Sequence, residues 1–234
     1  MPVEPEQLVV SINERDSVSA LLYAASTKKR AGITVILGHG AGANQTSPIM
    51  RLFANGLAER GLDVLTFNFI YMEQGRGAPD PKPKLEACYL AVIEAAVGHK
   101  KVRGNSLVIG GKSMGGRIAS QVAAEDQNDP GARLAGLVFL GYPLHPPGRP
   151  EKMRDAHLKS IRAPMLFIQG SRDAFGTPEE LRAVIERDGL PASLQVIEGG
   201  DHSFKVPKTS ALSQQQVYDM TMDQIVQWSK ENTK

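Results

Sequence analysis

The chain has 234 residues, of which 41% are hydrophobic and 22% are charged. These proportions are ordinary for a folded globular protein and exclude a disordered chain or a coiled coil. The net charge of +2 is too balanced to indicate a nucleic-acid or anionic-membrane partner. The length suits a single domain that spans residues 1–234.

The cysteine content and the N-terminal composition limit the class of protein further. Cys88 is the only cysteine, which excludes an intramolecular disulfide and any CxxC motif. The first ten residues lack the basic and apolar regions of a secretory signal. The longest uncharged stretch, residues 31–50, contains four glycines and several polar residues, so it cannot span a bilayer. These features predict a soluble cytoplasmic protein without a membrane partner.

Segments of two hydrophobic periods alternate along the chain. Short apolar runs predict strands at residues 8–12, 17–24, 33–37, 62–67, 107–110, 137–141, 165–170 and 194–197. Helices are predicted at 47–61 with Ser47 as N-cap, at 85–97, at 114–124, after a capping box at 177–180, and at 213–229 with Val217, Met220, Ile225 and Trp228 facing inward. Apolar strands that alternate with helices predict an α/β protein with a mostly parallel sheet covered on both faces. Ligands bind such sheets at the carboxyl ends of the strands.

One of these strand ends carries a nucleophile motif. Residues 107–116 contain the pattern G-x-S-x-G at Gly111, Ser113 and Gly115, between a predicted strand and a predicted helix. This is the setting that a nucleophile elbow needs. The glycines leave room for a sharp turn, and the following helix directs its first N–H groups towards a developing oxyanion. We interpret Ser113 as a catalytic nucleophile.

A serine nucleophile needs a base and a group that orients the base, and later strand ends offer both. Asp173 follows the predicted strand at 165–170, and His202 follows the one at 194–197. Three such residues in this order, each just past a strand, predict a Ser-His-Asp triad. Asp201 is an alternative acid, but a residue next to His202 in the sequence is poorly placed to hydrogen-bond its ring.

A glycine-rich turn, Gly-His-Gly-Ala-Gly-Ala at residues 38–43, follows the strand at 33–37. Its glycines permit a tight turn with N–H groups that point into the site. We expect the N–H groups of Ala41 and Met114 to form an oxyanion hole. His39 is interpreted as a structural hydrogen-bonding residue of the turn rather than as a base.

Other motifs at these strand ends fit less well. A phosphate-binding P-loop ending at Gly111-Lys112-Ser113 would need glycine at position 106, where the chain has Ser106. The turn at 38–43 also matches the dinucleotide pattern G-x-G-x-x-G/A, but the next predicted strand ends at Asn68 without the acidic residue that holds a ribose. The five histidines show no metal-ligand spacing. Neither a cofactor nor a metal is expected.

With these motifs in place, the chain resembles the α/β-hydrolase superfamily. Residues 38–42, 111–117 and 142–148 look like a small branch akin to dienelactone hydrolases, related to a testis-expressed protein and to a subunit of an animal chromatin complex. The resemblance implies a twisted, mostly parallel eight-stranded sheet flanked by helices, and esterase-like chemistry. Dienelactone hydrolases have a cysteine where this chain has Ser113, so their lactone specificity is not carried over.

The predicted loops suggest an open site. Only about twenty residues separate the strands at 137–141 and 165–170, too few for a large cap domain. The long connections at 71–84 and 142–150 are therefore expected to form the walls of the site. Tyr142 and His145 are predicted to bind substrate there. Lys112 is an unusual residue for an elbow, and it could pair with a buried carboxylate or extend into solvent.

The sequence thus favours a serine hydrolase that cleaves a small-molecule ester or thioester through an acyl-enzyme. The alternative is a non-catalytic interaction module that keeps the fold. Three intact residues in triad order argue against the module, because it would not need a strained elbow. The oligomeric state and the natural substrate are left open.

Overall fold

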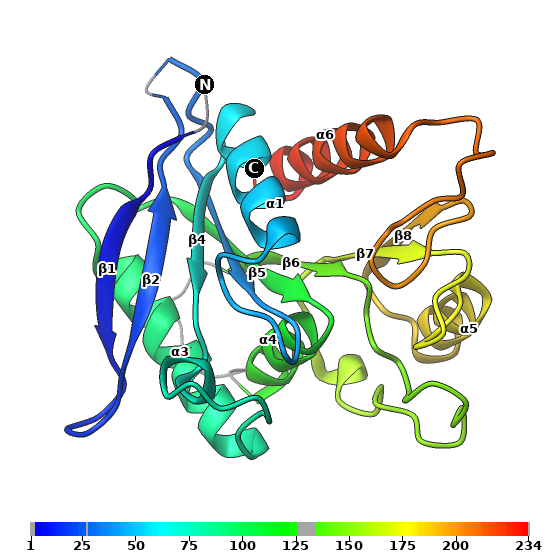
Figure 1. Ribbon diagram of the computed structural model, residues 1–234, viewed down its shortest axis with the longest axis horizontal. Helices are drawn as coiled ribbons and strands as arrows, with labels where there is room; N and C mark the ends of the chain where they lie inside the picture. Colours follow the sequence, from blue (N-terminus) through cyan, green and yellow to red (C-terminus); the bar gives the residue numbers. More distant parts are fainter. Residues whose placement is uncertain (1–2, 27, 126–133, 234) are drawn as a thin grey trace.

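The computed structural model describes residues 3–26, 28–125 and 134–233. Within these residues, eight strands form one sheet in the order β1-β2-β4-β3-β5-β6-β7-β8 (Figure 1). The strands are β1 Glu6–Ser11, β2 Ser17–Tyr23, β3 Ile33–Gly38, β4 Asp63–Phe67, β5 Ser106–Lys112, β6 Leu134–Leu140, β7 Met165–Gly170 and β8 Ala192–Ile197. The helices are α1 Pro48–Glu59, α2 Ile70–Glu73, α3 Lys82–Gly98, α4 Met114–Glu125, α5 Pro178–Asp188 and α6 Gln214–Asn232.

The sheet is parallel except at one edge. β1 pairs antiparallel with β2, and β2 pairs antiparallel with β4, whereas all the pairings from β4 through β3 to β8 are parallel. The carboxyl ends of six strands therefore lie along one border of the sheet. The mostly parallel eight-stranded sheet expected from the sequence is confirmed.

Helices cover both faces of the sheet. α1 and α6 lie on one face, and α3, α4 and α5 lie on the other (Figure 1). The predicted capping box of α5 is present, because the Thr177 side chain accepts the Glu180 N–H and the Glu180 carboxylate accepts the Thr177 N–H. Cys88 is fully buried in α3, as expected of a small core residue.

The inward face of α6 differs from the prediction at one residue. Val217, Ile225 and Trp228 are buried as expected, but Met220 is 56% exposed. Met222 occupies the buried position instead. At 100° per residue, Met220 and Met222 lie on opposite flanks of the stripe that the other three residues define, and packing of Met222 against Gly56 of α1 decides which flank is buried.

The described connections at the carboxyl border of the sheet do not form a lid domain. The only regular structure described between β6 and β7 is a single 3-10 turn at Leu158–Ser160. α2 occupies the start of the connection predicted at 71–84, and α3 begins at its end. In the part of the chain that the structure describes, no helix is both long and apolar enough to cross a bilayer.

A glycine contact joins α4 to the end of β3. A Cβ atom on Gly115 would lie 2.1 Å from the Gly38 carbonyl oxygen, and one on Gly111 would lie 2.2 Å from the same oxygen. Side-chain carbon atoms do not approach backbone oxygen so closely, so both positions require glycine. The contact sets the distance between α4 and β3, and with it the position of the turn that connects β5 to α4.

We predict that Gly115→Ala lowers the free energy of unfolding by about 3 kcal/mol or more, because neither backbone can move without disturbing the sheet. Gly98→Ala is the matched control. Gly98 ends α3, and a Cβ atom there would meet no atom within 4 Å. Urea denaturation followed by circular dichroism measures both changes. Equal stability of the two variants would contradict the prediction.

Candidate active site

Ser113 lies in a strained turn between β5 and α4. Its φ of +51° is in the left-handed region, which residues with a side chain rarely adopt. The Ser113 N–H donates to the Leu140 carbonyl at 3.1 Å, and its carbonyl accepts the Arg117 N–H at 3.1 Å. The first bond ties the turn to β6 and the second starts α4. The sharp turn predicted from G-x-S-x-G is therefore present.

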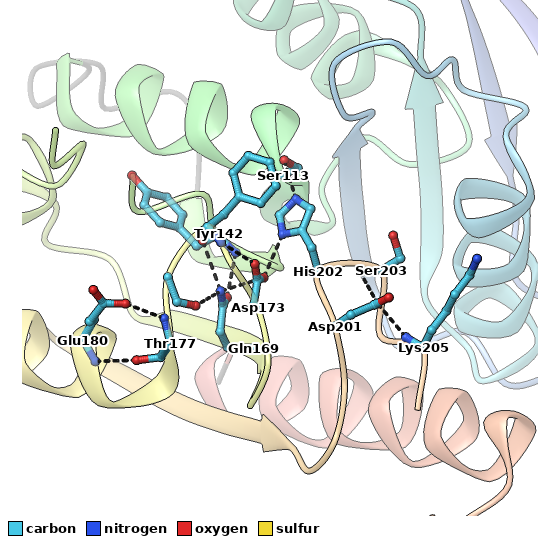
Figure 2. Close-up of polar contacts among 12 residues, drawn as sticks. Ser113, Tyr142, Gln169, Asp173, Thr177, Glu180, Asp201, His202, Ser203 and Lys205 are labelled. Carbon is cyan, nitrogen blue, oxygen red and sulfur yellow. Dashed lines mark hydrogen bonds and ion pairs between the residues drawn. The ribbon is translucent and has the colours of Figure 1, made fainter. Parts of the chain in front are cut away.

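The structure brings Ser113, His202 and Asp173 into one line of hydrogen bonds (Figure 2). His202 Nε2 lies 2.8 Å from Ser113 Oγ, and His202 Nδ1 lies 2.7 Å from Asp173 Oδ2. Because the carboxylate only accepts, Nδ1 carries the ring proton and Nε2 is free to accept the serine hydroxyl proton. The three residues come from the ends of β5, β7 and β8, as the sequence predicted.

Asp173 is buried and fully engaged. Its side chain has no exposed surface, and three donors surround it. The Phe175 N–H donates to Oδ1 at 2.8 Å, while Gln169 Nε2 at 2.9 Å and His202 Nδ1 at 2.7 Å donate to Oδ2. These three donors replace the water shell that a carboxylate loses on burial. The carboxylate is thereby fixed in the orientation that faces the ring.

Gln169 is a positioning residue that sequence reasoning missed. It ends the apolar run of β7 and is fully buried. Its Oε1 accepts the Tyr142 N–H at 2.8 Å, and its Nε2 also donates to the Gly176 carbonyl at 2.7 Å. Gln169 thus joins the segments that follow β6 and β7. The signal that was available is the single polar residue in the run Met-Leu-Phe-Ile-Gln-Gly.

Two phenylalanines hold the His202 loop. The Phe175 ring stacks on the imidazole, with centroids 4.2 Å apart and an interplanar angle of 29°. Phe204 is fully buried and has a φ of +63°. Asp201, the alternative acid, does not contact the His202 ring: its Oδ1 accepts the N–H groups of Ser203 and Lys205 and closes the turn (Figure 2).

The turn after β3 lies across from Ser113. Buried His39 donates from Nδ1 to the Gly40 carbonyl at 2.8 Å and accepts the Phe69 N–H at Nε2 at 3.1 Å. Burial lowers the pKa of His39 to about 4, so the ring is neutral, in keeping with the structural role expected of it. Ala41 and Met114 both line the cavity beside Ser113. Met114 is the first residue of α4, so its N–H has no acceptor within the helix.

A cavity of about 540 Å³ opens beside Ser113 and His202. Both predicted walls contribute to it, through Pro79 and Asp80 on one side and Pro143 on the other. Its remaining polar lining is formed mostly by basic side chains. Among the residues that the structure describes, no three His, Cys, Asp or Glu side chains gather in a way that could hold a metal ion.

The two predicted substrate-binding residues, Tyr142 and His145, do not line this cavity. Tyr142 is buried, and its ring points away from Ser113 (Figure 2). His145 is also buried, donating from Nδ1 to the Pro146 carbonyl at 2.9 Å, with Nε2 3.2 Å from Glu180. The prediction of their placement is wrong because position after a strand does not determine which way a side chain points.

Lys112 pairs with no carboxylate of the described residues, and it does not extend into bulk solvent. It is 7% exposed, and its Nζ has no hydrogen-bond partner among the described residues. The ammonium lies 5.7 Å from the centroid of the Phe204 ring. Burial lowers the pKa of Lys112 from 10.5 to about 8, against the attraction of Asp173 and Asp201. A lowered pKa means that the charged form costs stability.

We predict that Lys112→Met raises the free energy of unfolding at pH 7. The drop in the pKa of Lys112 from 10.5 to about 8 corresponds to a cost of about 3 kcal/mol, which methionine of similar shape avoids. Between pH 8 and 10.5 the unfolded chain binds more protons at this lysine than the folded one, so the native protein recovers stability as the pH rises. The advantage of the variant therefore shrinks above pH 8.

Denaturant titrations between pH 7 and 10 measure this difference. Lys100→Met is the control, because Lys100 is an exposed lysine in the connection between α3 and β5. A variant at position 112 that is less stable than the parent protein at pH 7 would contradict the predicted cost of the buried charge.

Comparison with known proteins finds a matching family and several similar solved structures. Residues 31–230 match the model of a family described as alpha/beta hydrolase domain. Similar solved structures include a dienelactone hydrolase from Anabaena variabilis, with 20% identity, 99% and 100% of the two chains covered and a TM-score of 0.71. An α/β serine hydrolase without a lid from Xanthomonas campestris shares 17% identity over 99% and 95% of the chains, with a TM-score of 0.70. A serine hydrolase homologue from Coxiella burnetii shares 17% identity over 98% and 97%, with a TM-score of 0.71.

At these identities the solved structures establish the fold alone. The narrower resemblance to the branch of the testis-expressed protein and the chromatin-complex subunit stays a prediction. The eight-stranded architecture and the family match agree with each other over nearly the whole chain. The chain belongs to the alpha/beta hydrolase domain family and has the α/β-hydrolase fold without a large cap.

Proposed function

We propose that the protein is a serine hydrolase that cleaves a small ester or thioester through an acyl-enzyme. One observation carries this proposal: Ser113 Oγ, both nitrogens of His202 and Asp173 Oδ2 form a continuous relay with bonds of 2.8 and 2.7 Å. Hydrolase and esterase names among the structural neighbours agree with this reading. The left-handed Ser113 supports it as well, because strain of this kind is found where function needs it.

In the proposed first step, Ser113 Oγ attacks the carbonyl carbon of the substrate while His202 Nε2 takes the hydroxyl proton. The Nδ1–H bond to Asp173 holds the imidazole in the required tautomer and stabilises the imidazolium. The carbonyl oxygen becomes an oxyanion, which the N–H groups of Ala41 and Met114 would bind. Each such donor contributes roughly 3–4 kcal/mol to lowering the barrier.

Collapse of the tetrahedral intermediate then expels the alcohol or thiol. His202 donates its proton to that leaving group, and the acyl group remains on Ser113. In the second half, His202 activates a water molecule, which attacks the acyl carbon and releases the acid. No step needs a metal or an organic cofactor, because the base, the nucleophile and the oxyanion donors all come from the chain.

We expect a fluorophosphonate probe to label the purified protein at Ser113, because the relay makes that hydroxyl nucleophilic. Ser113→Ala should abolish labelling. Ser203→Ala is the matched control, since Ser203 also lines the cavity and should leave labelling intact. Intact mass and gel fluorescence measure the adduct. An unlabelled parent protein that is shown to be folded would overturn the proposal and favour a non-catalytic interaction module.

We predict that Asp173→Asn lowers kcat on an activated ester by on the order of 10⁴-fold, because an amide no longer holds the imidazole in the productive tautomer. Asp201→Asn is the matched control. Its amide oxygen can still accept the two N–H groups of the turn, so kcat should stay within a few-fold of the parent value. A larger loss for Asp201→Asn than for Asp173→Asn would assign the acid to Asp201.

A further inference from the structure

The cavity beside Ser113 has a strongly biased charge. The charged side chains that line it, apart from the histidine of the relay, are Asp80, Lys82, Lys112, Arg117 and Arg154. Four of these five are basic. A chain whose net charge is only +2 has therefore gathered positive charge around one opening.

Two of the five side chains are neutralised by neighbours within the protein. Asp80 forms an ion pair with Arg76, with Oδ1 2.5 Å from the guanidinium. Lys82 Nζ lies 3.1 Å from Glu86 and 3.0 Å from Glu125. Neither residue offers an unpaired charge to a ligand.

Arg117 and Arg154 have no such partner. No carboxylate of the described residues lies within ion-pair distance of either guanidinium; Arg117 Nη1 only donates to the neutral Gln121 amide, at 3.4 Å. The Nε of Arg117 is buried without an acceptor. Burial and then repulsion from Arg154 lower the pKa of Arg117, although attraction from Tyr142 and Glu86 opposes them. The two guanidinium groups therefore both line the cavity and lie close enough to repel each other. They keep N–H donors that no described residue accepts.

Side-chain hydroxyl groups hold the backbone carbonyls of both arginines. Ser120 Oγ donates to the Arg117 carbonyl at 2.7 Å, and the Tyr142 hydroxyl donates to the Arg154 carbonyl at 3.0 Å. The two hydroxyl oxygens are 3.4 Å apart, and His157 Nε2 approaches Ser120 Oγ at 2.8 Å. Tyr142 therefore supports the backbone of a residue that lines the cavity. These bonds hold the backbone of Arg117 in α4 and the backbone of Arg154 in the segment after β6.

A pair of guanidinium groups with free N–H donors matches an anion of planar, two-oxygen geometry. We propose that Arg117 and Arg154 together bind a carboxylate of the substrate, so that the protein acts on small esters that carry an anionic group. This inference rests on the proposed hydrolase function, because it assigns the substrate class of the same site. The anion would offset the repulsion between the two arginines.

Two matched ester pairs test the proposal, one for each side of the scissile bond. The mono-4-nitrophenyl ester of adipic acid is compared with 4-nitrophenyl hexanoate, and 4-acetoxybenzoate is compared with its methyl ester. Each pair differs in the anionic group and little else. We expect kcat/KM to be at least 10-fold higher for the anionic member of one pair. A neutral preference or equal rates in both pairs would overturn the inference.

Arg154→Gln should lower that anionic-to-neutral ratio by about 10- to 100-fold, the range expected for losing a charge-assisted hydrogen bond. Arg154→Lys should restore part of the ratio. Arg149→Gln removes the same charge from an exposed residue of the same loop and should leave the ratio unchanged. An unchanged ratio in Arg154→Gln would also overturn the inference. Arg154 is chosen because Arg117 is a half-buried residue of α4 and its replacement risks the fold.

Fluorophosphonate labelling separates this inference from the proposed function. Absence of labelling in the folded parent protein rejects the hydrolase itself. If labelling succeeds but turnover of all four esters is too slow to measure, protection of Ser113 decides. 4-Hydroxybenzoate should then slow labelling more than its methyl ester does, and Arg154→Gln should remove that difference. Equal protection by the two compounds would overturn the anionic substrate class.

Discussion

The backbone contact between Gly38 and Gly115 sets the geometry on which the rest of the site depends. It lets α4 approach the end of β3 more closely than any side chain would allow. Gly111 and Gly115 both contact Gly38, and they flank Ser113 in the chain. Ser113 is thereby held in a left-handed conformation that it would not adopt alone. Since β3 and β5 are neighbours in the sheet, the same contact brings the turn of Ala41 beside Ser113.

The other half of the site depends on buried polar groups rather than on close backbone approach. The Gln169 amide joins the segments after β6 and β7 and orients Asp173. Phe204 anchors the loop after β8, while Phe175 stacks on the face of His202. Three chain segments that share no local sequence are thereby held within hydrogen-bond distance of one another.

The buried charges of the site differ in how they are satisfied. Asp173 accepts three hydrogen bonds, which replace the water it loses on burial. Lys112, Arg117 and Arg154 have no carboxylate partner among the described residues, and desolvation lowers the pKa of Lys112 and of Arg117. Such unpaired cations destabilise the free protein. The proposed anionic substrate would convert that cost at Arg117 into affinity, because this guanidinium has already lost part of its water shell in the free protein.

What the sequence determined by itself is local and periodic. Apolar runs located the eight strands, the capping box located α5, and G-x-S-x-G located the turn at Ser113, because each of these depends on residues adjacent in the chain. The order of strand ends also brought Asp173 and His202 to the right border, since parallel strands all end there.

Only the tertiary structure decided which way the side chains beyond those strand ends point. Tyr142 turned into the interior and Arg154 lines the cavity, although both follow β6. Gln169, Lys112 and the arginine pair acquire their roles from atoms distant in sequence. Burial and pairing of polar groups depend on what packs against them from other segments, and no spacing within one segment contains that information.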